Sequence, residues 1–220
     1  NTAALSFGAN NPPPTTTEVY SWNGSSWQGV AGLNQTRTNA TGAGSQTSGL
    51  AIGGIAGSEI GNTEIWNGTI WTESADLSTA RRSLASSGSS SANALAYQGS
   101  SPTISGLTEE WNGTGINLGA WYTGGNMNTA RNNLNGNGAG TTTAALIAGG
   151  SAPPFSALTE SYNGTAWAEI NNLNTARYGL MMRGVQTSAL AAGGASGNPS
   201  PENPSFSREA RTESWNGYVW

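Results

Sequence analysis

The chain has 220 residues, a formal net charge of −4 and only 9% charged residues. All eight basic residues are Arg, and only two of them are adjacent, so the clustered cations of a phosphate-binding surface are missing and we expect no nucleic-acid partner. Cys and His are both absent, which excludes disulfides, thiolate nucleophiles and the commonest metal ligand. No apolar run approaches the roughly 20 residues of a membrane helix, so we expect no membrane insertion.

The first predicted element is a short apolar strand around Leu5 that ends in a glycine. Glu18, an Asn-Gly dipeptide at Asn23, Trp27 and Arg37 follow in that order. The same succession returns along the whole chain, and the leucines of successive apolar strands are 44 to 51 residues apart. Self-similarity at such a period is typical of a repeat architecture.

Five positions define the repeat, and the first is the leucine of the apolar strand, at Leu5, Leu50, Leu95, Leu146 and Leu190. Three residues later, the first position of a Gly pair is occupied by Gly8, Gly53, Gln98, Gly149 and Gly193. The recurring acidic residues are Glu18, Glu64, Glu109, Glu160 and Glu213. The aromatic residues that follow the Asn-Gly dipeptides are Trp27, Trp71, Trp121, Trp167 and Trp220. The recurring basic residues are Arg37, Arg81, Arg131 and Arg177.

Each repeat predicts four short strands and none shows the period of an amphipathic helix. The first strand follows the Arg, the second ends at the Gly pair, the third carries the Glu, and the fourth begins at the Trp. Asn-Gly between the third and fourth strands predicts a type I′ hairpin, because that turn needs a positive φ at both central residues. Four antiparallel strands per repeat are typical of a propeller blade, in which radial repetition protects the sheet edges. We therefore predict an all-β fold, a β-propeller of about five four-stranded antiparallel blades.

The repeat resembles the kelch repeat of β-propellers. Kelch repeats combine an apolar strand ending in Gly-Gly, a Tyr, a Trp at fixed spacing and an Arg before the next blade, and this pattern covers nearly the whole chain. The aromatic residue after the Glu departs from that pattern, because it is more often Trp than Tyr, as at Trp66, Trp111 and Trp215. We expect the Gly pair to allow close backbone packing, the Trp to pack between blades, and the recurring Arg and Glu to pair between strands or blades.

The 220 residues are predicted to form a single kelch-like domain, 1–220, with repeats at approximately 1–37, 38–81, 82–131, 132–177 and 178–220. The pattern begins inside a second strand and ends at Trp220, which opens a fourth strand, so about twenty residues of repeat are missing from a closed ring. Flanking sequence would supply them. We therefore expect a longer parent chain with five blades, or six or more if further repeats follow.

The most variable part of the repeat lies between the Gly pair and the Glu. This distance is ten or eleven residues in four repeats and twenty in the last, from Gly193 to Glu213. Loops of this kind share one face of a propeller, and variable loops on a rigid scaffold usually carry binding function. We therefore take residues 195–211 as a candidate ligand-binding loop. Its candidate residues are Asn198, Glu202, Phe206, Arg208, Glu209 and Arg211.

No catalytic, cofactor-binding or metal-binding residue is predicted, and we expect the chain not to be an enzyme. The kelch propellers that are copper radical oxidases need His and a Cys-modified Tyr, and neither is present. A sialidase-like site needs a cluster of Arg, whereas Arg at one equivalent position in every repeat is typical of a scaffold. Asp76 is the only Asp, so Asp-rich calcium loops are absent. Exposed Trp and Tyr side chains would stack on sugar rings, but we favour an interblade core for them.

The function that we favour is that of a non-enzymatic structural or adhesive module on a virion or extracellular surface. Near-identical units rich in Ser, Thr, Asn, Gly and Ala, without Lys, Cys or His, resemble the kelch-like repeats in structural proteins of marine bacteriophages. That resemblance implies a tail-fibre, tail-tip or capsid-decoration role, with other virion or surface-assembly subunits as partners. It also implies a host-surface glycan or protein as target. The alternatives are a secreted propeller lectin and a kelch protein–protein interaction adaptor.

Overall fold

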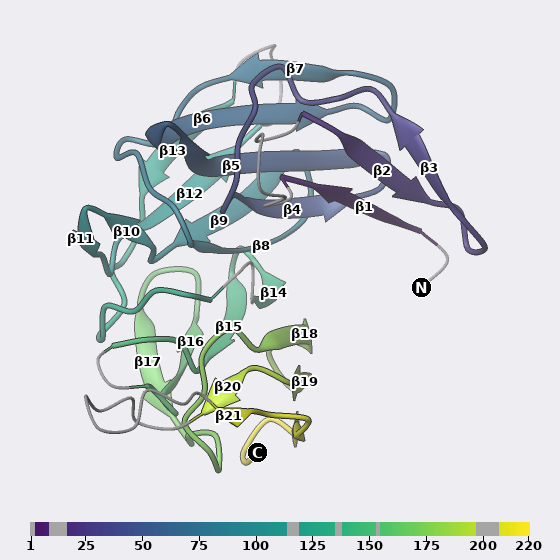
Figure 1. The fold of residues 1–220 in the computed structure, drawn as a ribbon. Coiled ribbons are helices and arrows are strands. Elements are labelled where there is room, and N and C mark those ends of the chain that lie inside the picture. Colours follow the sequence, from purple (N-terminus) through teal and green to yellow (C-terminus); the bar gives the residue numbers. More distant parts are fainter. Residues whose placement is uncertain (1–2, 9–16, 114–118, 135–137, 153–154, 197–206) are drawn as a thin grey trace.

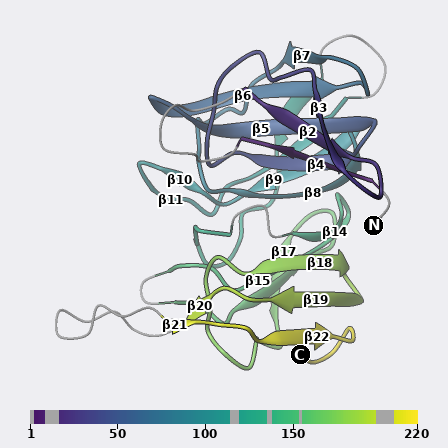
Figure 2. The same ribbon diagram turned by 45° about the vertical axis from the view of Figure 1, so that its right-hand side comes forward.

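The computed structural model describes residues 3–8, 17–113, 119–134, 138–152, 155–196 and 207–220. Within these ranges the chain contains strands and no helix. The strands form five antiparallel sheets of three or four strands, together with two small hairpins. Figures 1 and 2 show these five sheets, the blades, which follow one another in chain order. The chain is thus an all-β, five-bladed β-propeller, which confirms the predicted fold.

The first blade consists of β1 (Ala4–Phe7), β2 (Val19–Trp22) and β3 (Trp27–Val30). The second consists of β4 (Thr41–Ser45), β5 (Ser48–Ala56), β6 (Ser58–Trp66) and β7 (Trp71–Ser74). The third consists of β8 (Ala85–Ser90), β9 (Asn93–Tyr97), β12 (Thr108–Asn112) and β13 (Ala120–Thr123). The fourth consists of β14 (Ala139–Thr141), β15 (Ala144–Ala148), β16 (Thr159–Tyr162) and β17 (Trp167–Ile170). The fifth consists of β18 (Met181–Val185), β19 (Ser188–Ala192) and β22 (Thr212–Trp215).

A complete blade is a meander of an inner, a second, a third and an outer strand. The inner strands β4, β8, β14 and β18 contact one another in that order, which places them around the axis of the propeller. Among the described residues, the first blade has no inner strand and the fifth blade has no outer strand. Three blades therefore have the predicted four strands, and the two end blades have three.

The inner strands β4, β8 and β14 carry small side chains where they crowd together at the axis. The hydroxyl oxygens of Thr41 and Ser86, on neighbouring inner strands, lie 2.7 Å apart, and the Ser86 hydroxyl donates to the carbonyl of Gly42 at 2.8 Å. A Cβ added to Gly42 would lie 2.5 Å from Cζ of Phe7. Larger side chains on this strand would therefore overlap the second strand of the preceding blade.

The Gly pair at the end of a second strand is a place where the backbones of consecutive blades lie close together. Gly149 and Gly150 have φ values of +75° and +102°, a region that side-chain-bearing residues rarely adopt. A Cβ on Gly149 would lie 2.6 Å from the carbonyl oxygen of Arg177, in the next blade. The N–H of Gly150 donates to that same carbonyl at 2.9 Å. The predicted role of the Gly pair in close backbone packing is thus confirmed.

The tryptophans that follow the Asn-Gly dipeptides of the third, fourth and fifth blades pack onto the preceding blade. The indole N–H groups of Trp121, Trp167 and Trp220 donate to the hydroxyls of Thr63, Thr108 and Thr159, at distances of 3.0, 3.0 and 2.9 Å. Each of these threonines lies on the third strand of the preceding blade. The side chain of Trp167 is 5% exposed and contacts the ring of Tyr97, with centroids 4.9 Å apart. The main core therefore lies between blades, as predicted.

The hairpins between third and outer strands confirm the Asn-Gly signal but not the turn type. The N–H of Asn23 donates to the carbonyl of Ser26 at 3.2 Å, so Gly24 and Ser25 are the central residues. Gly24 has a φ of +99°, whereas the φ of Asn23 is not positive. Oδ1 of Asn23 accepts the N–H groups of Ser25 and Ser26, both at 2.9 Å. The type I′ prediction was wrong because Asn is the first of the four turn residues and not one of the two central ones. Gly therefore occupies the first central position, as in type II′ turns.

Candidate functional site

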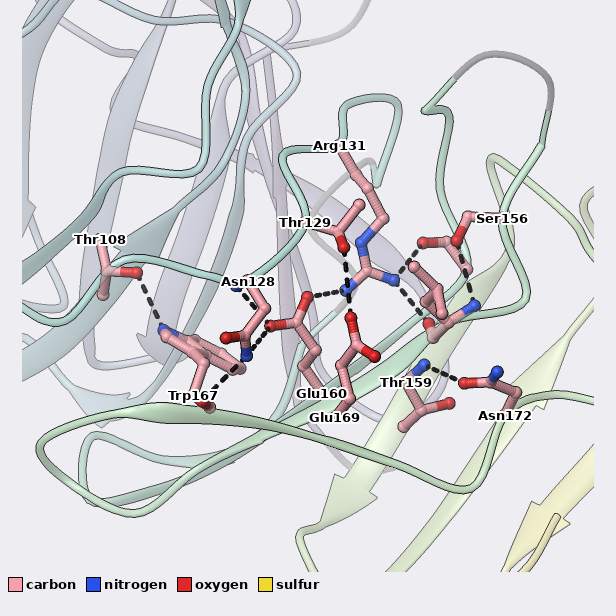
Figure 3. A network of polar contacts seen from close by, with 12 residues as sticks. Thr108, Asn128, Thr129, Arg131, Ser156, Thr159, Glu160, Trp167, Glu169 and Asn172 are labelled. Atoms are coloured by element: carbon pink, nitrogen blue, oxygen red, sulfur yellow. Dashed lines mark hydrogen bonds and ion pairs between the residues drawn. The ribbon is translucent and has the colours of Figure 1, made fainter.

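Each recurring Arg binds the recurring Glu of its own blade. In the fourth blade, Arg131 precedes the inner strand and Glu160 lies on β16, with 2.8 Å between Nη2 and Oε1 (Figure 3). Both side chains are fully buried. Nη1 of Arg131 donates to the carbonyls of Gly149 and Leu158, at 3.0 and 2.5 Å. One guanidinium group thus joins the Gly pair, the start of the third strand and the recurring carboxylate.

The second oxygen of the Glu160 carboxylate binds the connection between two blades. Oε2 accepts the backbone N–H and the side-chain Nδ2–H of Asn128, at 2.8 and 3.0 Å (Figure 3). Nδ2 of Asn128 also donates to the carbonyl of Trp167 at 2.9 Å. Because both carboxylate oxygens accept hydrogen bonds, the buried charge is well compensated.

The same ion pair recurs in four blades. The Nη2–Oε1 distances are 2.5 Å for Arg37–Glu64, 2.6 Å for Arg81–Glu109, 2.8 Å for Arg131–Glu160 and 2.6 Å for Arg177–Glu213. None of these side chains is more than 10% exposed. Of the two predicted arrangements, pairing between strands of one blade is therefore the one observed, and the inaccessibility of the pair indicates a scaffold role.

Burial governs the electrostatics of these pairs. Desolvation lowers the pKa of Arg37, Arg81 and Arg131, and the partner glutamate of each opposes that shift. Removing a glutamate would leave a buried cation without compensation. The recurring pairs are therefore held in place structurally and are not available for surface chemistry.

The residue directly after each recurring Arg differs from blade to blade, and we call these four the mouth residues: Thr38, Arg82, Asn132 and Tyr178. Each forms an isolated β-bridge just beyond the Gly pair of its blade, with Ile55, Ser100, Ser151 and Ala195 respectively. Two of these partners begin the hairpins formed by β10 (Ser100–Ser101) with β11 (Thr103–Ile104) and by β20 (Ala195–Ser196) with β21 (Ser207–Arg208). Figure 2 shows both hairpins on the same side of the molecule. The mouth residues therefore precede the inner strands on the hairpin face.

Three mouth side chains reach back to the preceding blade. Nε of Arg82 lies 3.4 Å from Oε1 of Glu59, and the arginine side chain remains 42% exposed. Nδ2 of Asn132 donates to the hydroxyl of Ser100 at 3.4 Å. The ring of Tyr178 stacks on the ring of Phe155, with centroids 4.6 Å apart and an interplanar angle of 26°. Equivalent positions in consecutive blades thus present a guanidinium, an amide and a phenol, all partly exposed.

The described ends of the predicted binding loop, residues 195–196 and 207–211, lie beside this row. Of its candidate residues, three fall outside the described residues: Asn198, Glu202 and Phe206. Arg208 is on β21 and is exposed. Strand β20 begins at Ala195, which is bridged to the mouth residue Tyr178. The described part of the loop therefore lies next to the mouth residue of the fifth blade.

The remaining two candidates tie the loop to the scaffold. The carboxylate of Glu209 accepts the hydroxyl of Ser196 and lies 3.1 Å from Nε of Arg211. Nη1 of Arg211 donates to the hydroxyl of Thr175 at 2.9 Å. Thr175 lies two residues before the recurring Arg177, so the end of the loop is anchored next to the fifth blade's ion pair.

The mouth residues themselves were not among the predicted site residues. Their signal is present in the sequence, because a constant Arg is followed each time by a different residue type. Spacing alone does not show that the constant residue is buried and that its neighbour is partly exposed in three of the four blades, Thr38 being buried. That distinction comes from the ion pair, which turns the Arg inward and leaves the next residue at the hairpin face.

The described aromatic side chains divide into a buried, a partly buried and an exposed group. Trp66, Trp71, Trp111, Trp167 and Trp215 are at most 5% exposed, as expected for interblade core. The most exposed rings are those of Tyr20 at 42%, Trp27 at 50%, Tyr122 at 59% and Tyr218 at 78%. Because most of these tryptophans are buried, they do not form a repeated surface on which sugar rings could stack.

Within the described ranges, no three acidic, His or Cys side chains gather where they would hold a metal ion. The same ranges contain no helix of the length and hydropathy that crossing a membrane requires.

The fold and the site together define a repeat β-propeller. Its recurring Arg–Glu pairs are buried in the scaffold, and its mouth residues differ from blade to blade on one face. No protein-family model matches the chain, and no curated protein matches it in sequence. The resemblance to kelch repeats and to bacteriophage structural proteins stays a prediction from the sequence pattern.

Proposed function

We propose that this propeller is a non-enzymatic binding module of the structural or adhesive kind, which contacts its target through the hairpin face. The observation that carries the proposal is a contrast between adjacent positions. The position of Arg131 is occupied by a buried arginine in four blades. The next position, occupied by Asn132 in the fourth blade, carries a different residue in each of the other three blades, and Asn132 is partly exposed. Variation at accessible positions of a fixed scaffold is typical of recognition surfaces.

The chemistry of the mouth residues favours recognition of a polar surface. Arg82 offers guanidinium donors, Asn132 offers an amide, and Tyr178 with Phe155 offers a stacked aromatic pair. Hydroxyl-rich sugars use such donors together with an aromatic face, and a guanidinium also pairs with carboxylates. We therefore favour a host-surface glycan as the target, with a surface protein as the alternative.

The setting that we propose is a virion or another extracellular surface, with assembly subunits as further partners. The support for this part is the resemblance of the Ser-, Thr-, Asn-, Gly- and Ala-rich repeats to those of phage structural proteins. Mass spectrometry of purified particles tests it, because a tail or capsid component must be present in stoichiometric amounts. Absence of the protein from particles would contradict the virion setting and leave the binding surface to be tested separately.

The binding surface is tested with a labelled chain on a glycan array and on isolated host-surface protein. The triple variant Arg82→Ser, Asn132→Ser, Tyr178→Ser removes the mouth side chains, and Tyr122→Ser, on the outer strand β13, is the matched exposed control. We expect the triple variant to bind at least about tenfold more weakly and the control to bind normally. Loss of glycan binding in the control alone would contradict the proposal and favour a lectin that uses its outer aromatic residues.

A further inference from the structure

The junction between the third and fourth blades departs from the repeat at its Gly pair. The third blade has Gln98 at the position that is glycine in the other four blades, for example Gly53 and Gly149. Gln98 keeps the backbone conformation of those two glycines, with a φ of +62° against +61° and +75°, although residues with side chains rarely adopt it. The side chain of Gln98 is 0% exposed, so it lies inside the structure where the other blades have no side chain.

A side chain at this position separates the backbones of the two blades. A Cβ on Gly53 or Gly149 would lie 2.7 or 2.6 Å from the carbonyl oxygen of the next blade's Arg. At these two junctions the second residue of the Gly pair donates to that carbonyl at 2.8 and 2.9 Å, whereas the bond from Gly99 to Arg131 is 3.5 Å long. The hydrogen bond is therefore longest where Gln98 supplies a Cβ.

A second backbone contact at the hairpin face is missing from the same junction. At two other junctions, the residue two positions after the recurring Arg donates its N–H to the equivalent carbonyl of the preceding blade. The pairs are Ser83 with Asn39 and Gly179 with Asn133, both at 3.0 Å. Within the described ranges, no such bond joins Asn133 to Ser83. The third and fourth blades are therefore joined less firmly at this face than their neighbours are.

Buried polar atoms without partners lie at this junction. Neither the amide oxygen nor the amide nitrogen of Gln98 has a hydrogen-bond partner among the described residues. The buried Oδ1 of Asn132 has none there either, and its Nδ2 donates to Ser100 at the long distance of 3.4 Å. A buried polar group without a partner raises the free energy of the folded state, because it has lost its hydrogen bonds to water. Separation of the two blades at this face would return the Gln98 amide to water.

The same two blades are held firmly away from the hairpin face. Trp167, on the outer strand β17, donates to the hydroxyl of Thr108 at 3.0 Å. A Cβ on Gly138, which directly precedes the inner strand β14, would lie 2.3 Å from the carbonyl oxygen of Ser86. In Figures 1 and 2 this junction separates β1–β13, in the upper part of each view, from β14–β22 in the lower part. Firm contacts beside a weakly joined face are the geometry of a hinge.

We propose that the junction of the third and fourth blades is a hinge at which the hairpin face opens. The fourth and fifth blades turn together away from the first three, and the pivot is the packing of Trp167 on Thr108. The closed form is the major one, because it buries Leu134 completely. In the minor open form the amide of Gln98 reaches water, and Asn132 moves away from the mouth residue of the third blade.

Thiol labelling tests the hinge at three equivalent leucines. The chain has no Cys, so Leu84→Cys, Leu134→Cys and Leu180→Cys each introduce a single thiol at a position that is at most 1% exposed. We expect a maleimide to label the Leu134→Cys variant at least about tenfold faster than the other two, because only that thiol lies at the hinge. Equal labelling rates, or a faster rate at either of the other positions, would overturn the proposal.

Gln98→Gly restores the repeat and tests the cause of the opening. In the Leu134→Cys chain we expect it to slow labelling at least about tenfold, and in the Leu84→Cys control we expect it to leave labelling unchanged. We also expect the melting temperature to rise by about 3–6 °C, because the unpaired amide and the side chain at positive φ are both removed. Unchanged labelling of Leu134→Cys, or a lower melting temperature, would show that Gln98 does not weaken this junction.

Amide exchange of the unsubstituted chain keeps the proposal testable if a Cys variant folds poorly. The probes are the N–H groups of Gly54, Gly99 and Gly150, which occupy one position of the repeat and donate to equivalent carbonyls. We expect the amide of Gly99 to exchange at least about tenfold faster than the other two. Similar exchange rates at the three glycines would rule out a hinge between the third and fourth blades.

Discussion

Two junctions between blades differ in burial although the same residues recur at both. At the junction of the third and fourth blades, Trp167 is 5% exposed and donates to Thr108 at 3.0 Å. At the junction of the fifth and first blades, the equivalent Trp27 is 50% exposed. The difference teaches that the tryptophan after the Asn-Gly turn depends on the preceding blade for its burial.

This dependence on neighbours is the expected behaviour of a repeat protein, in which stability is a sum of repeat and interface contributions. Leu95 and Leu146 sit between blades and are fully buried, whereas Leu190, on the second strand of the fifth blade, is 54% exposed in the described structure. Equivalent residues at the buried and at the exposed junction should therefore differ in how much their substitution lowers the free energy of unfolding.

The largest expected effect comes from breaking a buried ion pair. Glu160→Gln leaves Arg131 buried without a counter-charge, and we expect a loss of about 3–5 kcal/mol in the free energy of unfolding. Glu59→Gln breaks the partly exposed pair with Arg82, and we expect a loss below about 1 kcal/mol. Urea denaturation measures both, and similar losses in the two variants would contradict a scaffold role for the recurring pair.

The tryptophan comparison is the most direct probe of the two junctions. Trp167→Ala removes an indole that is packed between two blades, and we expect it to cost about 3–5 kcal/mol. Trp27→Ala removes a half-exposed ring, for which we expect about 1 kcal/mol. Equal losses in thermal or urea unfolding would mean that burial by the neighbouring blade is not what stabilises the tryptophan.

The Gly pair offers a matched comparison at one backbone conformation. Gly149→Ala places a methyl 2.6 Å from the Arg177 carbonyl, and we expect a loss of about 2 kcal/mol. Gly193→Ala has a similar positive φ but no neighbour closer than 3.7 Å, so only the backbone strain of about 1 kcal/mol is expected. Chemical denaturation of the two variants sharpens the comparison, and a larger loss at Gly193 would contradict it.

Alkaline pH tests the contact between the third and fourth blades. Burial, followed by the 2.5 Å hydrogen bond from Tyr162 to Glu110, raises the pKa of Tyr162 from 10.0 to about 12. Because the folded chain holds this phenol in its neutral form more firmly than the unfolded chain does, its contribution to stability is complete below pH 10. That contribution is lost as the pH rises from 10 through about 12, where the folded chain also releases the proton.

Burial also raises the pKa of Tyr97, at the same junction, so both tyrosines contribute to this loss. Tyr162→Phe should weaken the dependence of stability on pH above 10 relative to the unsubstituted chain. Stability measured across this pH range tests this expectation, and an unchanged slope in Tyr162→Phe would refute the linkage.

The repeat of the fold could be predicted from the sequence. Strands, turns and closely packed glycines each require particular residue types, and these recur at fixed spacing. The turn at Asn23 was predicted as a hairpin of the wrong type, since spacing does not show whether an Asn side chain caps the backbone. The pairing of Arg131 with Glu160 was one of two arrangements that spacing allowed.

The candidate site was only partly accessible to sequence reasoning. Loop length pointed to Arg208 and Arg211, which do lie on the hairpin face of the fifth blade. The contact of Tyr178 with Phe155 joins residues of two blades, and no regular period connects such positions. Residues whose roles depend on contacts across blades therefore emerged only from the three-dimensional arrangement.

Amide hydrogen exchange of the whole chain tests most directly whether each blade depends on its neighbours. If it does, the amides of β9 and β15, whose strands are paired on both sides, will exchange at least about 100-fold more slowly than those of β1, whose strand has an open edge. Uniform protection of β1, β9 and β15 would contradict the account, because it would show that an end blade is as stable as an internal one.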